Sequence, residues 1–553
     1  MFRKRTAKER FWEVLPGLQL WTVFFGAILL SYYRPVWAAL FIICFDLYWV
    51  LKALNVATHL VASYKIFQFV VKLNWLDYAA RAIDLETLQE FLNARLALAQ
   101  NHTARNFYKS QLSKISLLRS QNRKGADYAD YYHLVLIPFV NESMEVLDST
   151  LAAISASNYP KEKIILLLGS EERAGQEAQD IARKIKEKYQ ANFLRFFVAT
   201  HPDGLEGEIK GKSANAAYAT KSIMPELEKM GISVPQILVS NFDSDTIIHP
   251  QYFARVMYEF LTAEKPYQTS YQPITIFNNN IWDSPALIRV ISVSNSFWQF
   301  TESSRPDRLR TFSSHTMTLK ALVDVGFWKK DIINEDGYIY WQCYLRYNGD
   351  YRVEPLFIPI SLDTCLASTT WQTMINQYKQ KRRWAYNVEY FPHLLPALIK
   401  SKAPFWDKAY KFYQYVEGNF NWAAASILIT FLGRLPLYIG GQAFQQSVVG
   451  YNLPKITLIL LNIALVFLIF SVYINLVLLP PRPKKYGIGR SAMMYLQWFL
   501  VPLTSIIFGS LPAIESQTRL MFGWYLEFWV TPKARKGENT GLHMKEMQSV
   551  KSS

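Results

Sequence analysis

Two carboxylates separated by one residue are the strongest chemical signal in the chain. Asp243 and Asp245 flank Ser244 and directly follow the apolar run ILVSNF, which predicts a strand. Residues two apart in an extended backbone point to the same face, so we expect both carboxylates to face one point. Paired carboxylates suit Mg²⁺ or Mn²⁺, which bridge the phosphates of a nucleotide. The alternative is a solvated acidic turn.

Two further runs carry polar residues that suit phosphate chemistry. The run LIPFVNE predicts a strand ending at Pro138, with Glu142 just beyond it. The run GEIKGKSAN contains Lys212, whose ammonium group could bind a diphosphate, and Asn215. This run is not a P-loop, because that motif requires glycine at the position of Glu206.

A pair of acids and a basic aromatic run follow further along the chain. Asn334 is predicted to cap a helix that places Glu335 and Asp336 in its first turn. One of these carboxylates could take a proton from a sugar hydroxyl, or both could only complement the helix dipole. In QYKQKRRWAYNVEY, Arg383 could pair with a diphosphate and Trp384 could stack on a sugar ring. The alternative is an interfacial helix anchored by these two side chains.

The elements that must position these residues alternate between strand and helix over residues 129–370. The runs HLVLIPFV, KIILLLG, FLRFFVAT and QILVSNFD predict strands, and EAQDIARKIKEKYQ predicts a helix. This alternation predicts an α/β domain with a largely parallel sheet, in which ligands bind at the carboxyl ends of the strands. A helical connecting segment, 56–128, precedes the domain, and a segment suited to a membrane surface, 371–420, follows it.

Apolar runs on both sides of this domain predict membrane spans. Residues 14–33 and 36–51 predict a membrane hairpin within 1–55, interrupted at Arg34-Pro35, and only Asp46 is charged in the second run. Residues 421–553 form a C-terminal transmembrane region with a basic tail. Its strongest span is 456–479, and its weaker candidates are 422–440, 493–509 and 511–530.

Charge placement indicates how these spans are oriented. The net charge of +16 is concentrated beside apolar runs, at the N-terminus, at 482–485 and at 533–536. We interpret this as cytoplasmic-side charge rather than nucleic-acid binding, so no nucleic-acid partner is expected. An even number of spans after the α/β domain would fit, four in the simplest count, although the sequence supports only two or three. The three cysteines form no CxxC pair, which fits a reduced compartment.

Taken in order, the motifs resemble those of family 2 glycosyltransferases of the GT-A fold, in particular the membrane-embedded processive type that includes cellulose and hyaluronan synthases. The resemblance covers about residues 130–390. LIPFVNE is similar to the family's first-strand motif, GKSAN to its Lys-x-x-Asn segment and DSD to its metal motif. NED is similar to its Thr-Glu-Asp motif, with Asn334 in place of threonine, and QKRRW to its Gln-x-x-Arg-Trp motif.

The resemblance implies a Rossmann-like GT-A domain joined to an α-helical transmembrane region, and an inverting, metal-dependent sugar transfer. Asp336 would be the catalytic base, with Glu335 beside it, and Asp245 would bind Mg²⁺ or Mn²⁺ together with Asp243. On the donor side it implies Glu142, Glu171, Lys212, Asn215 and Asp243, and on the diphosphate and acceptor side Gln380, Arg383 and Trp384. The family's Asp-rich base-binding motif is replaced here by LLLGSEERAG, so that either Glu171 or Glu172 could contact the base.

Three functions remain open from the sequence. The first is a processive polysaccharide synthase using a UDP- or GDP-linked sugar, and the second is a single-sugar transferase acting on a lipid-linked acceptor. The third is a membrane scaffold with a degenerate, non-catalytic domain. The first two predict a multi-pass protein in contact with membrane lipids, at the plasma membrane, with a cytoplasmic catalytic domain. The runs ITIFNNNIW and TFSSHTM are expected to line the acceptor side, with His315 structural.

Overall fold

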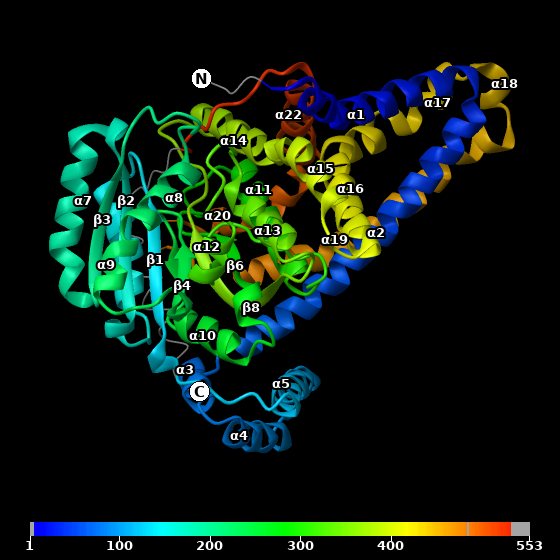
Figure 1. Cartoon of the computed structure of the whole chain (residues 1–553). Helices are drawn as coiled ribbons and strands as arrows, with labels where there is room; N and C mark the ends of the chain where they lie inside the picture. The colour runs from blue at the N-terminus through cyan, green and yellow to red at the C-terminus, as the bar shows by residue number, and fades with distance from the viewer. Residues whose placement is uncertain (1–4, 484–485, 532–553) are drawn as a thin grey trace.

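The computed structural model describes residues 5–483 and 486–531 of the chain. Figure 1 shows a sheet covered by helices, and two long helices that meet in a turn far from the sheet. These are α1 (Ala7–Tyr33) and α2 (Pro35–Val70), separated by Arg34 as the sequence predicts. α17 (Leu435–Ile439) packs against both of them, and α19 (Val448–Leu478) packs along α2.

The sheet has eight strands in the order β3-β2-β1-β4-β7-β6-β8-β5. The four strands expected from the sequence are present and run parallel. They are β1 (Tyr132–Pro138), β2 (Ile164–Glu171), β3 (Arg195–His201) and β4 (Ile237–Asn241). β1, β2 and β4 are nearly continuous runs of buried aliphatic residues, as strands covered on both faces require.

The other half of the sheet is mixed, but the expectation of a largely parallel sheet holds, because only the short strands β5 and β7 run against the other six. β7 (Thr316–Thr318) runs antiparallel to both β4 and β6 (Thr269–Phe277). β8 (Arg352–Leu362) is parallel to β6, and β5 (Ile247–Ile248) is antiparallel to β8. β5 and β7 have only two and three residues, which is too short for a readable alternation.

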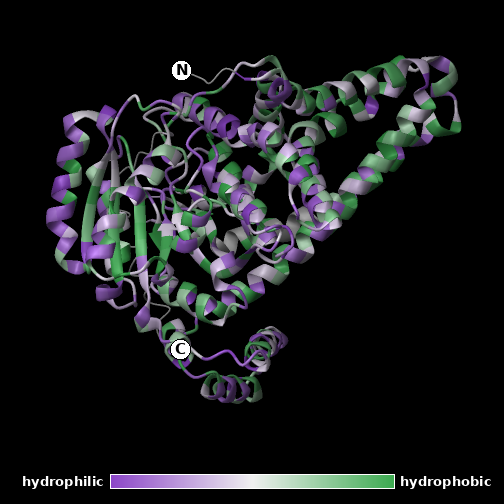
Figure 2. Cartoon of the chain, viewed as in Figure 1, coloured by the Kyte–Doolittle hydropathy of each residue, from purple (hydrophilic) through white to green (hydrophobic). Residues whose placement is uncertain are grey.

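Helices cover both faces of the sheet. They are α6 (Met144–Ser155), α7 (Gly175–Tyr189), α8 (Lys212–Ser222), α9 (Met224–Lys229), α10 (Tyr252–Thr262), α11 (Ala286–Ser303), α12 (Leu319–Asp324) and α13 (Glu335–Arg346). α7 corresponds to the helix predicted from EAQDIARKIKEKYQ, and its hydrophilic outer surface is visible in Figure 2. α10 and α11 are largely buried, because they lie between the sheet and the helices of the termini.

Three segment boundaries expected from the sequence fall inside α-helices, although the one at 370/371 separates only the first residue from α14 (Thr370–Ala385). The boundary at 55/56 lies within α2, which continues unbroken to Val70. Three helices then form the connecting segment: α3 (Trp75–Arg81), α4 (Leu85–Ala97) and α5 (His102–Ser120). The boundary at 420/421 lies within α16 (Phe405–Thr430).

The helices beyond the sheet include most of the expected apolar runs. They are α14 (Thr370–Ala385), α15 (Phe391–Lys400), α16, α17, α18 (Gly441–Gln445), α19, α20 (Ile488–Leu496), α21 (Val501–Thr504) and α22 (Leu511–Phe522). Four helices among the described residues are long and apolar enough to cross a membrane: Ala7–Tyr33, Pro35–Val70, Val448–Val466 and Gly489–Phe522. The last of these joins two runs that the sequence suggests are separate. α16 and the short helix ending at Ile439 pass the same test together, but they are bent by 46°. The basic positions 484, 485 and 533–536 lie outside the described residues.

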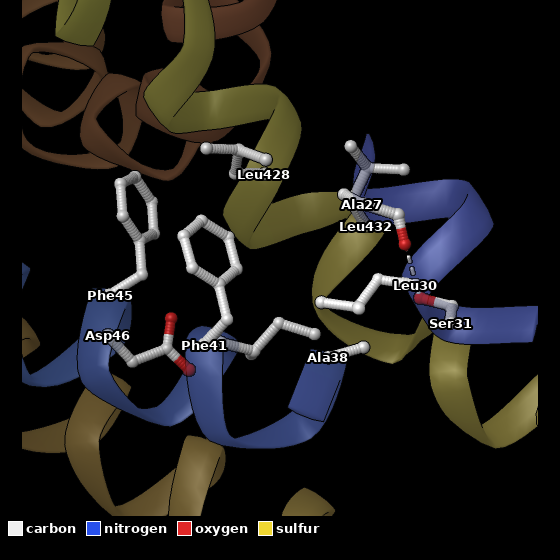
Figure 3. A pocket seen from close by; sticks show the side chains of 10 residues that line it. Ala27, Leu30, Ser31, Ala38, Phe41, Phe45, Asp46, Leu428 and Leu432 are labelled. Atoms are coloured by element: carbon white, nitrogen blue, oxygen red, sulfur yellow. Dashed lines mark hydrogen bonds between the residues drawn. The ribbon is translucent and has the colours of Figure 1, made fainter. Parts of the chain in front are cut away.

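The one acid of the predicted hairpin, Asp46, lies in a small cavity between α1, α2 and α16 (Figure 3). Apolar side chains surround it, including Phe45 and Leu428. The cavity of about 10 Å³ is at the lower limit for one water molecule. This feature is therefore a polar point inside an apolar helix bundle and not a ligand site.

The connecting helices are fastened to the domain through Trp75. Its side chain is fully buried, its indole N–H donates to the Val70 carbonyl at 2.9 Å, and the Arg255 guanidinium lies 3.8 Å from its ring. We expect Trp75→Ala to destabilise the fold by about 3–5 kcal/mol, because it leaves a large cavity and strips a buried cation of its aromatic partner. Thermal unfolding in detergent measures this as a lowered midpoint. Trp371→Ala, at a side chain 69% exposed, is the matched control, and equal midpoints for the two variants would contradict the prediction.

Candidate active site

A cavity of about 750 Å³ opens at the carboxyl ends of β1 and β4 and extends to α2, α11 and α16. All eleven residues singled out from the sequence line this cavity. They are Glu142, Glu171, Lys212, Asn215, Asp243, Asp245, Glu335, Asp336, Gln380, Arg383 and Trp384. The structure therefore gathers motifs up to 240 residues apart around one space. Phe277, Phe312 and Ser313, from the two runs expected on the acceptor side, line it as well.

Lys212 is the point at which three of the motifs meet. It is the first residue of α8, and its side chain is 13% exposed. Its ammonium nitrogen lies 2.8 Å from Asp243 Oδ1, 3.3 Å from Asp336 Oδ2 and 3.7 Å from Glu335 Oε1. These carboxylates hold the pKa of Lys212 above its usual range, although burial opposes the charge.

The two acids of the DSD run sit in a turn, not in the extended backbone that the sequence predicts. β4 ends at Asn241, and the Thr246 N–H donates to the Asp243 carbonyl at 3.0 Å. Asp243 accepts hydrogen bonds from Lys212 and Ser313, whereas Asp245 Oδ2 accepts from the backbone N–H of Asp363 at 2.8 Å. Both carboxylates line the cavity. They do so from a turn, so the alternation of side chains along a strand is not the reason.

Helix α13 begins at Glu335, as predicted, but Asn334 does not cap it with its side chain. The Asn334 amide instead donates to the Arg383 carbonyl at 2.9 Å, which ties the loop before α13 to α14. Glu335 is buried, while Asp336 is only half-buried. Burial, followed by the charge of Asp336, raises the pKa of Glu335 to about 8. Asp336 is thus the better exposed of the two acids toward the cavity.

Glu389 and Tyr390 hold this loop in place, a role that no sequence motif indicated. Glu389 Oε1 accepts the backbone N–H groups of Ile333 at 2.8 Å and Asn334 at 3.1 Å, and the Tyr390 hydroxyl donates to the Asn334 carbonyl. The Tyr390 hydroxyl also lies 2.9 Å from where a Cβ on Gly337 would be, so a larger residue there would have to displace this hydroxyl. Burial raises the pKa of Glu389 to about 8.

The donor-side residues connect the strand ends. Glu142 Oε1 accepts from the Ser244 hydroxyl at 2.9 Å and so joins the loop after β1 to the DSD turn. Asn215 donates to the Gly169 carbonyl at 2.9 Å, and its Oδ1 has no partner among the described residues. Glu171 lines the cavity and pairs with a neighbouring arginine, whereas Glu172 is absent from the lining and accepts the Asp203 N–H.

Helix α14 presents the QKRRW run to the cavity, as the sequence predicts. The negative charges of Glu335, Asp243 and Asp336 favour the protonated form of Arg383, but burial has the larger effect and lowers its pKa. Its guanidinium is 4.9 Å from the ring of Phe528, and Gln380 donates to the Thr531 hydroxyl at 3.3 Å. Residues 528–531, which follow α22, therefore close one side of the cavity; their aromatic and β-branched composition gave no chemical signal in the sequence.

The charges at the sheet end of the cavity suit a divalent cation and a diphosphate. The described lining there has seven carboxylates against two cations. The carboxylates are Glu142, Glu171, Asp243, Asp245, Glu335, Asp336 and Asp363, and the cations are Lys212 and Arg383. No three His, Cys, Asp or Glu side chains among the described residues are grouped as a metal-ligand set. Mg²⁺ or Mn²⁺ fits here only with some of its oxygen ligands supplied by a bound phosphate.

Comparison with solved structures finds glycosyltransferases. One is a mannosyltransferase from Pyrobaculum calidifontis in complex with GDP-mannose and Mn²⁺, at 14% identity over 73% of this chain and 96% of that chain, with a TM-score of 0.36. Another is S. aureus TarS 1–349 in complex with UDP-GlcNAc, at 12% identity over 61% of this chain and 90% of that chain, with a TM-score of 0.34. No protein-family model and no curated protein matches the chain. Similarity this low leaves the function to be argued from the cavity itself.

The raised pKa of Glu389 predicts how stability depends on pH. A carboxyl that binds its proton more tightly in the folded state stabilises the fold fully below its ordinary pKa of 4.5, and this contribution is lost as pH rises toward 8. Glutamine keeps the oxygen that accepts two N–H groups but does not titrate. We expect the thermal midpoint of Glu389→Gln to fall less between pH 5 and 8.5 than that of the wild type. Glu226→Gln, at an exposed position, should follow the wild type, and parallel curves for all three proteins would refute the prediction.

Proposed function

We propose that this chain is an inverting membrane glycosyltransferase of family 2 with a GT-A catalytic domain. It moves a sugar from a UDP- or GDP-linked donor to a saccharide or lipid-linked acceptor. The observation that carries the proposal is the meeting of Asp243, Glu335 and Asp336 at the buried ammonium of Lys212, inside a cavity large enough for both substrates. Intact acids, lysine and arginine at one point argue against a degenerate scaffold.

The transfer follows from the positions of these groups. Asp336 accepts the proton of the acceptor hydroxyl, whose oxygen forms the new bond to the anomeric carbon while the bond to the nucleoside diphosphate breaks. The electron pair of that bond leaves with the diphosphate, and configuration inverts because attack comes from the opposite face. Mg²⁺ or Mn²⁺, when bound by Asp243 and Asp245, supplies charge to the diphosphate.

Lys212 and Arg383 bind the diphosphate of the leaving group. A diphosphate entering the cavity competes with the carboxylates for the ammonium of Lys212, which frees Asp336 to act as a base. Arg383, on the facing helix, offers a planar fork that matches phosphate oxygens. Trp384 packs against Phe312, 6.2 Å between ring centroids, and so lies on the acceptor side of the reacting groups.

The same proposal orients the protein in a membrane. α1 and α16–α17 lead away from the catalytic domain, and α2 and α19 lead back to it, which gives two crossings on each side of the domain. Residues 489–522 begin beside Trp282, whose carbonyl accepts from Arg490 at 2.7 Å, and they lead to Phe528 in the cavity wall. Both ends of this segment thus lie on the catalytic side, together with Arg10, which donates to the Leu520 and Met521 carbonyls. The domain is then cytoplasmic in a multi-pass plasma-membrane protein, and the simplest expectation of four later spans is not needed.

The acid–base assignment is tested by Asp336→Asn. We expect sugar transfer to fall by about 10²–10⁴-fold, because the acceptor loses its proton acceptor, while donor binding remains. The measurement is nucleotide release by the detergent-solubilised protein with a panel of UDP- and GDP-sugars. Asp324→Asn, at a carboxylate bonded to Lys320 and Tyr347 outside the cavity, is the matched control. Full release by Asp336→Asn would remove this residue from its assigned role.

Chelation tests the metal assignment. We expect EDTA to abolish nucleotide release and Mn²⁺ or Mg²⁺ to restore it, because two cations cannot balance seven carboxylates and an added diphosphate. In Asp245→Asn the metal concentration needed for half-maximal release should rise. Release that persists after exhaustive chelation would contradict the assignment.

A further inference from the structure

The wall of the cavity near α2, α11 and α16 has the opposite charge from the sheet end. Its described lining contains five cations and two carboxylates. The cations are Lys52, Arg305, Arg308, Arg310 and Lys381, and the carboxylates are Glu302 and Glu417. Glu417 pairs with both Lys52 and Arg308, and Glu302 pairs with Arg305 at 3.2 Å. We call these seven residues the basic wall.

Two cations of the basic wall have no carboxylate within salt-bridge distance in the part of the chain that the structure describes. Lys381 donates to the Asn295 side-chain oxygen at 2.6 Å and lies 5.2 Å from the Trp384 ring and 5.8 Å from the Trp422 ring. Arg310 stacks 4.5 Å from the Trp341 ring, and its Nη1 is buried without a hydrogen-bond partner among the described residues. Burial lowers the pKa of Lys381 to about 8. Lys381 is thus a cation held by two rings and one amide oxygen, and it is short of an anion. Arg310 Nη2 donates to the Gln414 side-chain oxygen at 3.3 Å, which leaves Nη1 as its unpaired group.

Aromatic rings are interleaved with these cations. Trp298 packs edge-on against Phe312, Phe312 against Trp384, and the Lys381 ammonium bridges Trp384 to Trp422. This row begins beside Ser313, which bonds Asp243, and it ends at α16. Flat indole faces bind sugar rings, whereas a lipid phosphate would need the cations but not a row of rings.

We propose that the acceptor is an acidic saccharide, an inference that rests on the proposed function. Its sugar rings stack on this aromatic row, and its carboxylate or phosphate groups pair with Lys381 and Arg310. The opposite charges of the sheet end and the basic wall orient such an acceptor in the cavity. The negative sheet end repels the acidic groups of such an acceptor and the basic wall holds them, so the acceptor lies with its hydroxyl toward Asp336. Lys381 occupies an unspecified position of the Gln-x-x-Arg-Trp motif. We assign it to anion binding because its ammonium lies near the rings of Trp384 and Trp422.

The test is calorimetric binding without donor, so it does not depend on transfer. The ligands are a glucose hexasaccharide, the same hexasaccharide oxidised at C6 to uronic acids, and a short polyprenyl phosphate, each added to the full-length protein in detergent. We expect the acidic hexasaccharide to bind at least tenfold more tightly than the neutral one. Lys381→Gln should reduce this ratio to about one, Lys381→Arg should restore most of it, and Lys400→Gln, at the exposed end of α15, should leave it unchanged.

Three outcomes would overturn the proposal: equal binding of the two hexasaccharides, no binding of the acidic one, or preference for polyprenyl phosphate. Each leaves the transferase proposal standing if nucleotide release with the donor panel is observed. Conversely, selective binding of the acidic hexasaccharide without nucleotide release from any donor would support this acceptor site and reject the transferase.

Discussion

The buried ammonium of Lys212 is the interaction on which the catalytic end of the molecule depends. It places one positive charge among Asp243, Glu335 and Asp336, which come from a turn after β4 and from the start of α13. Without it, these carboxylates would repel one another in a space largely shielded from water. The lysine is held as the first residue of α8, so the sheet and its crossover helix fix the point at which the motifs meet.

This arrangement leaves the cavity electrically divided. The sheet end carries an excess of carboxylates, and the basic wall carries an excess of lysine and arginine. Trp384 and Phe312 lie between the two ends. A metal-bound diphosphate suits the first end and an anionic acceptor suits the second, so the division of charge gives the two substrates separate places in the cavity. Hydrogen bonds from Glu389 and Tyr390 fix the loop that leads into Asp336.

Many of the elements that position the candidate residues could be predicted, because they depend on the local pattern of apolar and polar residues. The buried strands β1, β2 and β4 are largely apolar runs, Pro138 ends the first, and Arg34 separates two long apolar helices. Glu142, Glu171, Asp243 and Asp245 line one cavity because the carboxyl ends of parallel strands meet at one edge of the sheet. The other seven candidate residues reach the same cavity from the helices α8, α13 and α14. Their individual roles remain proposals.

What could not be predicted depends on contacts between distant segments. Asn334 looked like a cap, but its amide goes to the Arg383 carbonyl instead. The DSD acids looked like neighbours on a strand, but they lie in a turn. Glu389, Lys381 and Phe528 gave no signal, because their surroundings come from segments far away in the chain. Short strands such as β5 and β7 form because their neighbours are already in place, not because of their own composition.

The central claim is that the carboxylates and Lys212 together form a site completed by a nucleoside diphosphate and a divalent cation. The most direct measurement is the affinity for Mn²⁺ with and without UDP or GDP, determined by electron paramagnetic resonance. Tight Mn²⁺ binding that requires one of the nucleotides, and that is weakened in Lys212→Gln, is the predicted result. Mn²⁺ binding that is equally tight without nucleotide, or that is insensitive to both nucleotides and to the loss of the lysine, would contradict the account.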